Sequence, residues 1–309
     1  MVEQKKILVV QIGKLGDMVL TTPLFYELNK HFPDYELYVL ASEINHEIPS
    51  KIPFIKKTYI FKKNLFLLPI LLKLKSLKFD ILIDIKPEFS KTGKMLLNFI
   101  KPKSSMGFNS EENNYLINLS NFSKGNHFVD FSLSPLYSLV QNFEPEFTKP
   151  VLISKITNLK FDLVLNISSG MKIRNWSIDY WIEVIKYCEK LNLKVGVIYD
   201  KYQIDRLKYL IKYFNDKINL IKPDLESKIY AVSDSKLVIS TDTSIVHIAS
   251  AFNKPIIALY TNVNWNLERF KPLSEIQKIL ISDSPDSVNS IKPDEVIDTI
   301  NELRNEGVL

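Results

Sequence analysis

Cysteine, histidine, arginine and glycine are all scarce in this chain of 309 residues. The single cysteine, Cys188, excludes an internal disulfide framework and is typical of a protein from a reducing compartment. The four histidines are scattered, so the sequence contains no metal-ligand cluster of recognisable spacing. Arginine is nearly absent and no nucleic-acid-binding motif occurs, which argues against a nucleic-acid partner.

Long apolar runs are also missing. No window approaches the ~18 apolar residues of a membrane-spanning helix. Residues 1–6 lead directly into a predicted strand, so we expect no signal peptide. With 46% hydrophobic and 24% charged residues, the composition is that of a globular protein. The sequence therefore predicts a cytoplasmic protein with one large or two medium domains.

Two of the eight glycines lie close together after the first predicted strand. Residues 5–11 form a nearly continuous apolar run, which is typical of a strand buried on both faces of a parallel sheet. The loop 13–17 (GKLGD) contains Gly13 and Gly16, and apolar residues at helical spacing follow from 18 to 32. Glycine fits where the backbone turns tightly or approaches a ligand closely. We therefore predict that this loop contacts a ligand.

Residues 235–260 repeat this design, with a buried strand, a polar turn, a short helix and a second buried strand. Asp242, Thr243 and Ser244 are all good N-cap residues, so one of them should begin the helix. His247 lies one turn further on, on the same side. A helix N-terminus carries partial positive charge and unpaired N–H groups, so this turn is a predicted phosphate site. The same pattern also fits a well-capped turn that binds no ligand.

A third loop, residues 166–176, also follows a predicted strand and precedes a predicted helix. It offers small hydroxyl residues, a glycine and two cations, which suits a diphosphate. Lys172 would act as a point charge and Arg174 as a bidentate partner. The alternative is a basic loop in which Trp176 fills the core.

Predicted strands alternate with predicted helices along the chain, which favours doubly wound parallel sheets. The alternation stops at residues 143–159, which we interpret as a domain linker. The sequence thus predicts two α/β domains, residues 1–148 and 149–309. Ligands of such sheets bind outside the carboxyl ends of the strands, so the polar loops should face a cleft between the halves. The predicted strands are 5–11, 35–41, 57–61, 79–85, 105–109, 162–167, 194–199, 219–221, 237–240 and 256–260. The predicted helices are 18–32, 65–77, 91–100, 129–142, 176–191, 203–214, 225–232 and 293–306, with a further short helix after residue 244.

Eight lysines and no acidic residue occur between residues 51 and 79, more positive charge than the net +5 of the whole chain. One interpretation is a solvated basic face beside a core helix. The other is a surface for an anionic partner, either a membrane leaflet or a phosphorylated glycolipid. The lysines are Lys51, Lys56, Lys57, Lys62, Lys63, Lys73, Lys75 and Lys78.

Together, the three loops resemble glycosyltransferase family 9, the lipopolysaccharide heptosyltransferases of GT-B fold. The resemblance rests on residues 7–23 (ILVVQIGKLGDMVLTTP), 174–176 (RNW), 242–247 (DTSIVH) and 254–255 (KP), in the family's order and spacing. It implies two Rossmann-like domains facing a cleft, and inversion at the anomeric carbon. It also implies an ADP-heptose donor bound mostly by the C-terminal domain and an acceptor sugar of the lipid A inner core bound by the N-terminal domain.

The resemblance also assigns roles to residues. The family's catalytic aspartate matches Asp17, and the basic residue that steadies the donor diphosphate matches Arg174. With Asp17 as the base, the helix after Asp242 together with Arg174 and Lys172 would hold the departing diphosphate without a metal or other cofactor. Asp17 could instead only cap the first helix. The predicted donor-side residues are Ser168, Ser169, Gly170, Lys172, Asp242, Thr243, Ser244 and His247, and the acceptor-side residues are Gly13, Lys14 and Gly16.

Three positions depart from the family pattern. Ser244 occupies a position that is usually glycine, Ser177 replaces a frequent proline, and residues 261–265 replace a glycine-proline turn, so the donor sugar and base stay open. Two other functions also stay open: a nucleotide-sugar epimerase of the same fold, and a non-catalytic scaffold that binds a nucleotide sugar or a glycan. A hydride-transfer enzyme is disfavoured because the first loop lacks the full glycine fingerprint. The expected location is the cytoplasm, at the inner face of the cytoplasmic membrane.

Overall fold

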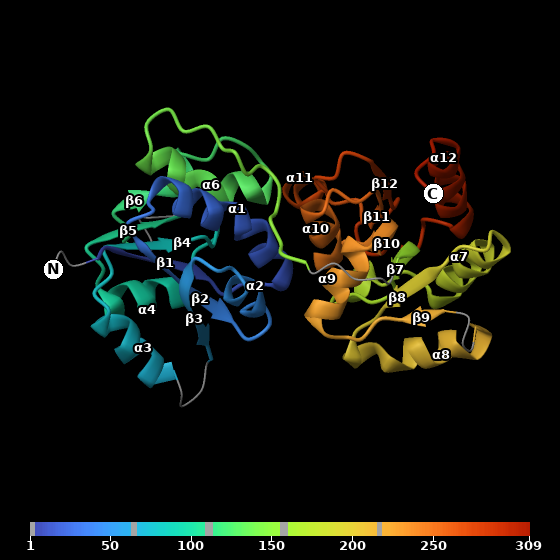
Figure 1. Cartoon of the computed structure of the whole chain (residues 1–309), viewed down its shortest axis with the longest axis horizontal. Helices are drawn as coiled ribbons and strands as arrows, with labels where there is room; N and C mark the ends of the chain where they lie inside the picture. Colours follow the sequence, from blue (N-terminus) through green and yellow to red (C-terminus); the bar gives the residue numbers. More distant parts are fainter. Residues whose placement is uncertain (1–3, 63–66, 109–113, 155–159, 215–217) are drawn as a thin grey trace. The chain divides into compact units, whose positions relative to one another are not determined.

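The structure is a computed structural model that describes residues 4–62, 67–108, 114–154, 160–214 and 218–309. The chain divides into two compact units, Met1–Ile153 and Ser154–Leu309. The division falls within residues 143–159, where the sequence shows no periodic pattern. Each unit contains a parallel sheet of six strands with helices on both faces (Figure 1). The predicted class, doubly wound parallel α/β, is confirmed.

The N-terminal unit begins with its central strand. Its elements are β1 (Lys6–Gln11), α1 (Leu15–His31), β2 (Glu36–Ser42), α2 (Glu47–Ser50), β3 (Ile55–Phe61), α3 (Leu67–Ser76), β4 (Ile81–Asp84), α4 (Lys91–Ile100), β5 (Ser104–Gly107), β6 (Ile117–Asn118), the 3-10 turn η1 (Leu119–Asn121) and α6 (Phe128–Leu139). The strand order is β3-β2-β1-β4-β5-β6. Helices α1 and α6 cover one face of the sheet, and α3 and α4 cover the other (Figure 1).

The C-terminal unit is built in the same way. Its elements are β7 (Phe161–Asn166), the 3-10 turn η2 (Lys172–Arg174), α7 (Ile178–Lys190), β8 (Val195–Ile198), the 3-10 turn η3 (Lys201–Gln203), α8 (Ile204–Phe214), β9 (Asn219–Leu220), α9 (Leu225–Ser233), β10 (Ser235–Thr241), α10 (Ser244–Ala251), β11 (Ile256–Tyr260), α11 (Asn264–Phe270), β12 (Gln277–Ile281) and α12 (Pro293–Asn305). The strand order is β12-β11-β10-β7-β8-β9.

Both sheets reverse their strand order beside the first strand of the unit. Strands β1 and β4 are neighbours in one sheet, and β7 and β10 are neighbours in the other. The chain leaves the first strand toward one edge of the sheet and later returns to its other side. Ligands of doubly wound sheets bind at the carboxyl ends of the strands at such a reversal. The loops after β1 and β4, and those after β7 and β10, are therefore the candidate ligand-binding loops.

The core of the C-terminal unit explains why its central strands are mostly apolar. Apart from Asp162 in β7 and Lys236 in β10, the residues of β7, β8, β10 and β11 are buried, so neither face has to carry exposed polar side chains. Trp176 and Trp181 are fully buried and pack edge to face, with ring centroids 4.8 Å apart. The Trp176 indole N–H donates a 2.9 Å hydrogen bond to the main-chain oxygen of Ile291. Trp176 thus fills the core, as one interpretation of its loop predicted.

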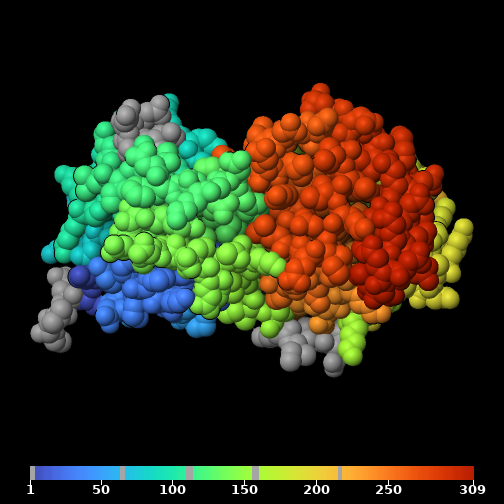
Figure 2. Space-filling model, turned by 90° about the horizontal axis from the view of Figure 1, so that it is seen from above, coloured from blue at the N-terminus to red at the C-terminus, as the bar shows by residue number. Residues whose placement is uncertain are grey.

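The segment after α6 is fixed to helix α1. The carboxylate of Glu27 is fully buried and accepts hydrogen bonds from the main-chain N–H groups of Glu146 (2.6 Å) and Phe147 (2.9 Å). Thr22 accepts one from the N–H of Val151 at 2.8 Å. Figure 2 shows α6 and this segment, in green, on the surface over the blue part of the N-terminal unit. Residues up to Val151 of the predicted linker therefore pack as part of this unit.

Two elements near the end of the chain were not predicted from the sequence. Helix α11 and strand β12 lie in a stretch that the sequence left without structure. The helix is short and polar, and every residue of the edge strand is at least partly exposed, so neither shows a clear apolar period. Helix α1 also begins three residues earlier than predicted, at Leu15. Parts of the predicted elements 65–77 and 105–109 lie outside the described residues.

Candidate active site

A cluster of three side chains joins the segments that follow three strands at the carboxyl edge of the C-terminal sheet. Arg174 follows β7, Asp242 follows β10, and Asn266 lies in α11 after β11. The Arg174 Nη2 atom lies 2.9 Å from Asp242 Oδ2, and Nη1 donates a 3.1 Å hydrogen bond to the Asp242 main-chain oxygen. The two side chains are only 19% and 5% exposed. Water and salt therefore screen this ion pair less than a surface pair.

Thr243 is the N-cap of helix α10, beside this cluster. Its hydroxyl accepts a hydrogen bond from the N–H of Ile245 at 3.3 Å and another from the side-chain amide of Asn166 at 3.0 Å. The same amide donates to the hydroxyl of Ser240 at 3.1 Å. The ends of two neighbouring strands thus fix the start of the helix. The prediction that one residue of the turn begins the helix is confirmed, and Ser244 is the first helical residue.

The predicted phosphate loop after β7 has a buried part and an accessible part. Ser168 is buried, and its hydroxyl accepts a 3.0 Å hydrogen bond from the N–H of Asp200. Ser169 is also buried and bonds to the backbone two residues further on. Gly170 and Lys172 are exposed, and a Cβ at Gly170 would meet no heavy atom of the described residues within 4 Å. The serines therefore shape the loop, and Gly170, Met171 and Lys172 are its exposed residues.

His247 lies in the interior of the C-terminal unit and packs against the helix that carries Asn266. The histidine is 4% exposed, and its ring centroid lies 6.2 Å from that of Phe270 at the end of α11. The buried Tyr260 donates a 2.7 Å hydrogen bond to the main-chain oxygen of Phe270. Burial, reinforced by the negative charge of Asp242, raises the pKa of Tyr260 well above its ordinary value, so the phenol stays protonated. These contacts hold α11 against the sheet.

In the N-terminal unit, the loop after β1 is shorter than predicted. Because α1 begins at Leu15, Gly16 and Asp17 lie in its first turn. Asp17 Oδ2 accepts a 3.0 Å hydrogen bond from the N–H of Lys14, which is a capping contact. A Cβ at Gly13 would lie 2.5 Å from Asp17 Oδ2. Gly13 therefore makes room for the capping carboxylate, and its presence alone does not favour catalysis over capping.

The main chain of this loop is anchored from the end of β2. The fully buried Asn45 donates from its amide to the main-chain oxygens of Gln11 and Gly13, both at 3.1 Å. The Ser42 hydroxyl donates to the same Gly13 oxygen at 3.1 Å. The position of the loop is thus determined by a neighbouring strand as well as by α1.

A second carboxylate, Asp84, ends β4, the neighbour of β1. It is 5% exposed and accepts hydrogen bonds from the Tyr115 hydroxyl at 2.5 Å and from the N–H of Lys86 at 3.1 Å. Burial raises the pKa of Asp84 above its ordinary value, although both hydrogen bonds oppose the shift. A Cβ at Gly93 would lie 2.3 Å from Asp84 Oδ2, and one at Gly107 would lie 2.4 Å from the Tyr115 ring. Two of the eight glycines therefore make room for this buried pair.

The lysine-rich segment, residues 51–78, is partly neutralised by acidic residues from elsewhere in the chain. Lys56 Nζ lies 3.0 Å from a carboxylate oxygen of Glu36, and Lys62 Nζ lies 2.7 Å from one of Glu43. These glutamates lie in β2 and just after it. The local excess of positive charge in the folded protein is thus smaller than the sequence of the segment indicates. Lys63 lies outside the described residues.

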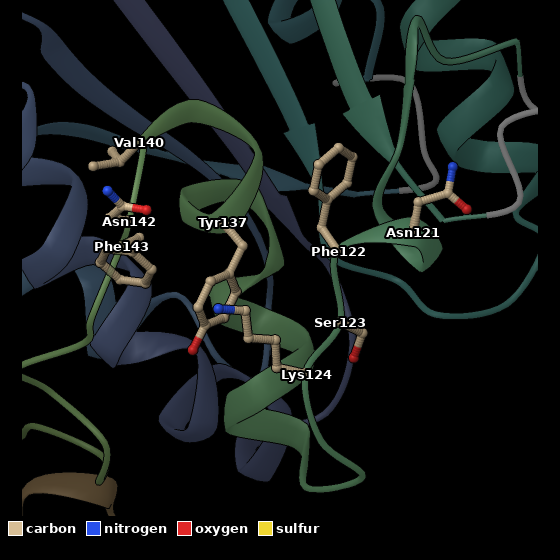
Figure 3. Close-up of a pocket in the computed structure, with 8 residues that line it drawn as sticks. All are labelled: Asn121, Phe122, Ser123, Lys124, Tyr137, Val140, Asn142 and Phe143. Carbon is tan, nitrogen blue, oxygen red and sulfur yellow. The ribbon is translucent and has the colours of Figure 1, made fainter.

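A cavity of about 260 Å³ lies elsewhere in the N-terminal unit (Figure 3). It is lined by η1 and the loop after it, and by the end of α6 with the segment that follows. The Lys124 ammonium lies over the ring of Tyr137, 4.2 Å from its centroid. No residue of this cavity belongs to the predicted site.

No group of three or more histidine, cysteine, aspartate or glutamate side chains within the described ranges could hold a metal ion. None of the helices formed by these residues combines the length and the apolar character needed to cross a bilayer.

Asn266 and Asp84 were not predicted as site residues. Asp84 could have been found, because it ends a buried apolar run at the edge where ligands of such sheets bind. Asn266 carries a weaker signal. It lies just after the strand 256–260, at the same edge as Asp242, but it is flanked by the exposed polar and aromatic residues Asn264 and Trp265.

Part of this chain matches a known protein family. The sequence model of glycosyltransferase family 9 (heptosyltransferase) matches residues 141–296, about half of the chain. This match includes the loops that hold Arg174, Asp242 and Asn266. No curated protein sequence matches the chain.

Solved structures of similar fold cover nearly the whole chain. A glycosyl transferase family 9 protein from Veillonella parvula has a TM-score of 0.83 at 17% identity, over 99% of both chains. E. coli heptosyltransferase WaaC, solved with ADP, has a TM-score of 0.78 at 17% identity, over 96% of this chain and 99% of its own. E. coli ADP-heptose lipopolysaccharide heptosyltransferase II has a TM-score of 0.77 at 14% identity, over 98% and 100%. At these identities the likeness shows the GT-B fold.

Proposed function

This chain belongs to glycosyltransferase family 9 and is a glycosyltransferase, and we propose that it transfers a heptose from ADP-heptose to a lipopolysaccharide-core or related glycan, with inversion at the anomeric carbon. The choice of donor is supported by the structural relative solved with ADP and by the ADP-heptose in the name of another. The C-terminal unit, Ser154–Leu309, binds the donor. The N-terminal unit, Met1–Ile153, binds the acceptor. The reaction needs no metal and no cofactor.

The observation that carries the donor half of the proposal is the buried Arg174–Asp242 pair beside the N-terminus of α10. A guanidinium and a helix N-terminus both favour a diphosphate, and the exposed Lys172 adds a second cation. Asp242 accepts hydrogen bonds from hydroxyl groups of the donor sugar or the ribose. The residues that complete the donor side are Ser168, Ser169, Gly170, Thr243, Ser244 and His247.

Asp17 is the base on the acceptor side. It takes a proton from the acceptor hydroxyl while that oxygen bonds to the anomeric carbon and the bond to the diphosphate breaks. Arg174 and Lys172 stabilise the negative charge that develops on the departing diphosphate. The capping contact with Lys14 is compatible with this role, because a carboxylate has about four lone-pair sites and can accept more than one hydrogen bond. Gly13 and Gly16 keep the backbone close to the acceptor.

Helix α3 provides the membrane-facing surface for a lipid-linked acceptor. Leu68 and Leu72 lie one turn apart and are 57% and 54% exposed. The exposed Lys73 and Lys75 follow in the last turn of the same helix. Exposed leucines beside lysines match an anionic bilayer, since the leucines enter its apolar boundary and the lysines meet its phosphates.

Sedimentation with vesicles tests this surface. Vesicles that contain phosphatidylglycerol should retain the protein at low salt, and pure phosphatidylcholine vesicles should not. The double variant Leu68→Ser/Leu72→Ser should lose retention, whereas Leu116→Ser, at a leucine that is 70% exposed in the same unit, should keep it. Equal retention of both variants would remove α3 from the proposal.

A thermal-shift screen against ADP, UDP, GDP, CMP and NAD tests the donor. Saturable stabilisation by ADP is expected, because a ligand that binds only the folded state raises the melting temperature. A response to UDP or GDP alone would keep the glycosyltransferase and discard ADP-heptose. Transfer is then assayed with the matching nucleotide sugar. Turnover without an acceptor would favour an epimerase, and tight binding without transfer to any acceptor pool would favour a scaffold.

A further inference from the structure

Asn266 is a buried amide that connects both members of the Arg174–Asp242 pair. Its side-chain oxygen accepts a 3.2 Å hydrogen bond from Arg174 Nη2, and its side-chain nitrogen donates a 2.7 Å hydrogen bond to Asp242 Oδ2. The residue is 3% exposed. Arg174, Asp242 and Asn266 follow three different strands, so these contacts connect the segments after the carboxyl ends of β7, β10 and β11.

The chemistry of the three groups permits one orientation of the amide. With its oxygen toward the guanidinium and its nitrogen toward the carboxylate, each contact joins a donor to an acceptor. Rotating the amide by half a turn would place N–H against N–H and oxygen against oxygen. An asparagine therefore fits this position by hydrogen-bonding pattern as well as by size.

The support of Asn266 is rigid. Helix α11 is held at its end by the hydrogen bond from Tyr260 to Phe270 and by the packing of His247 on the Phe270 ring. The N–H of Asn266 bonds to the main-chain oxygen of Val263 at 3.0 Å. A side chain on such a support loses little freedom when it makes its contacts, so it can hold its partners in place.

Arg174 keeps hydrogen-bonding capacity beyond this cluster. Two N–H groups of Nη2 face Asp242 and Asn266, and one of Nη1 faces the Asp242 main chain. The Nε–H is buried and has no hydrogen-bond partner in the part of the chain that the structure describes. Buried donors are nearly always satisfied, and a phosphate oxygen would satisfy this one.

We infer that Asn266 is a positioning residue of the donor site, which fixes the Arg174 guanidinium against Asp242 so that the donor diphosphate meets a preformed site. This inference rests on the proposed function, since it assigns the pair to the donor. Asn266 acts through Arg174 and Asp242. Without it, both side chains gain rotational freedom that diphosphate binding must remove, which weakens binding.

Calorimetric titration with ADP, UDP and GDP tests the role of Asn266. Wild type is compared with Asn266→Ala, which removes both hydrogen bonds, and with Asn266→Asp, which keeps the size but opposes two carboxylates. Asn264→Ala is the matched control, an exposed asparagine on the same helix. All titrations are run at a temperature at which circular dichroism shows each variant to be fully folded.

We expect at least one of these nucleotides to bind wild type. Asn266→Ala should weaken that binding about tenfold, because hydrogen bonds to charged groups are lost. Asn266→Asp should weaken it further, and Asn264→Ala should change it less than about twofold. Wild type that binds none of the three would overturn the proposed donor class and this inference with it. Wild type that binds, with Asn266→Ala equal to the control, would overturn the inference alone.

A double-mutant comparison separates positioning from simple structural support. Arg174→Lys should weaken nucleotide binding in wild type and have a much smaller effect when combined with Asn266→Ala, because the guanidinium is then no longer held. A residue that only stabilises the fold would lower the melting temperature and leave the two effects additive. Additive effects would therefore overturn the inference.

Discussion

The two sheets connect their strands in the same order, but the carboxylates at their carboxyl edges are held in different ways. In the N-terminal unit, Asp17 accepts from a main-chain N–H, and Asp84 accepts from a phenol and a main-chain N–H. In the C-terminal unit, Asp242 is held by the guanidinium of Arg174 and the amide of Asn266. At the first edge, Asp84 is held by the Tyr115 hydroxyl and a main-chain N–H, and at the second, Asp242 is paired with a buried cation.

Under the proposed function, this difference lets one topology serve two chemical tasks. A carboxylate held by neutral donors keeps its negative charge available for a proton, which suits the base of a transfer reaction. A carboxylate paired with arginine compensates the buried cation while leaving a cationic edge toward a phosphate. The fold provides the loops, and the residues at the strand ends determine what each loop does.

Replacement of Asp17 by asparagine should have the largest effect. Asparagine can still accept the hydrogen bond from Lys14, so stability should change by less than about 0.5 kcal/mol. Turnover should fall by roughly 10²- to 10⁴-fold, because a general base is lost. Nucleotide affinity should stay within twofold, since the proposed donor site lies in the other unit. Steady-state kinetics with titration calorimetry measure both, and turnover within tenfold of wild type would make Asp17 a cap only.

Loss of Arg174 should strongly destabilise the C-terminal unit. In Arg174→Ala, the carboxylate of Asp242 stays buried without its cation, so the free energy of unfolding should fall by about 3 kcal/mol. Urea denaturation measures the change. Asp242→Asn/Arg174→Ala removes both charges and should recover part of the loss. A double variant less stable than Arg174→Ala would show that the charge of Asp242 is not the reason for the destabilisation.

Replacement of Tyr115 by phenylalanine removes one of the two neutral donors to Asp84, at the carboxyl edge of the N-terminal sheet. Burial raises the pKa of Asp84, so the folded state holds its proton to higher pH and stability falls as pH rises above the unfolded value of about 4. The Tyr115 hydroxyl opposes this shift. Its loss should therefore cost about 1–2 kcal/mol at pH 8 and less at pH 5.

Urea denaturation at pH 5 and pH 8 measures these costs. Tyr209→Phe, at a tyrosine that is 37% exposed in the other unit, is the control and should show no such difference between the two pH values. If Tyr115→Phe lowers the free energy of unfolding equally at both pH values, Asp84 does not change its protonation between them. The Tyr115 hydroxyl then does not control the charge of Asp84, which would contradict the contrast with the Arg174–Asp242 pair.

Alanine at two loop glycines should have the smallest effects, and unequal ones. At Gly13 the new Cβ would lie 2.5 Å from Asp17 Oδ2 and 2.9 Å from Gln11 Oε1, so the carboxylate must move and its cap is lost. We expect a loss of about 1 kcal/mol of stability and reduced turnover. At Gly170 the Cβ meets open space, so stability should change by less than about 0.5 kcal/mol. Equal melting temperatures for the two variants would contradict this difference.

Much of the fold and part of the site could be predicted from local sequence. The strands β1, β7, β10 and β11 are short apolar runs, and each is followed by polar or glycine-containing residues, so their existence and the position of their loops follow from periodicity. The start of α10 follows from the N-cap preference of threonine. Helix α11 and strand β12 could not be predicted, because a short polar helix and a partly exposed edge strand carry no strong apolar period.

The sequence by itself determined the α/β alternation, the loops at the strand ends and the residue types within them. Only the tertiary structure decided which of these residues meet. Arg174 and Asn266 are 92 positions apart, and Asp242 and Asn266 are 24 apart. Their contact depends on β7, β10 and β11 being consecutive in the sheet. The pairing of Asp84 with Tyr115 depends likewise on the close approach that Gly93 and Gly107 permit. Local periodicity reports burial and turns, whereas strand order arises from packing of the whole domain, which brings distant loops to one edge.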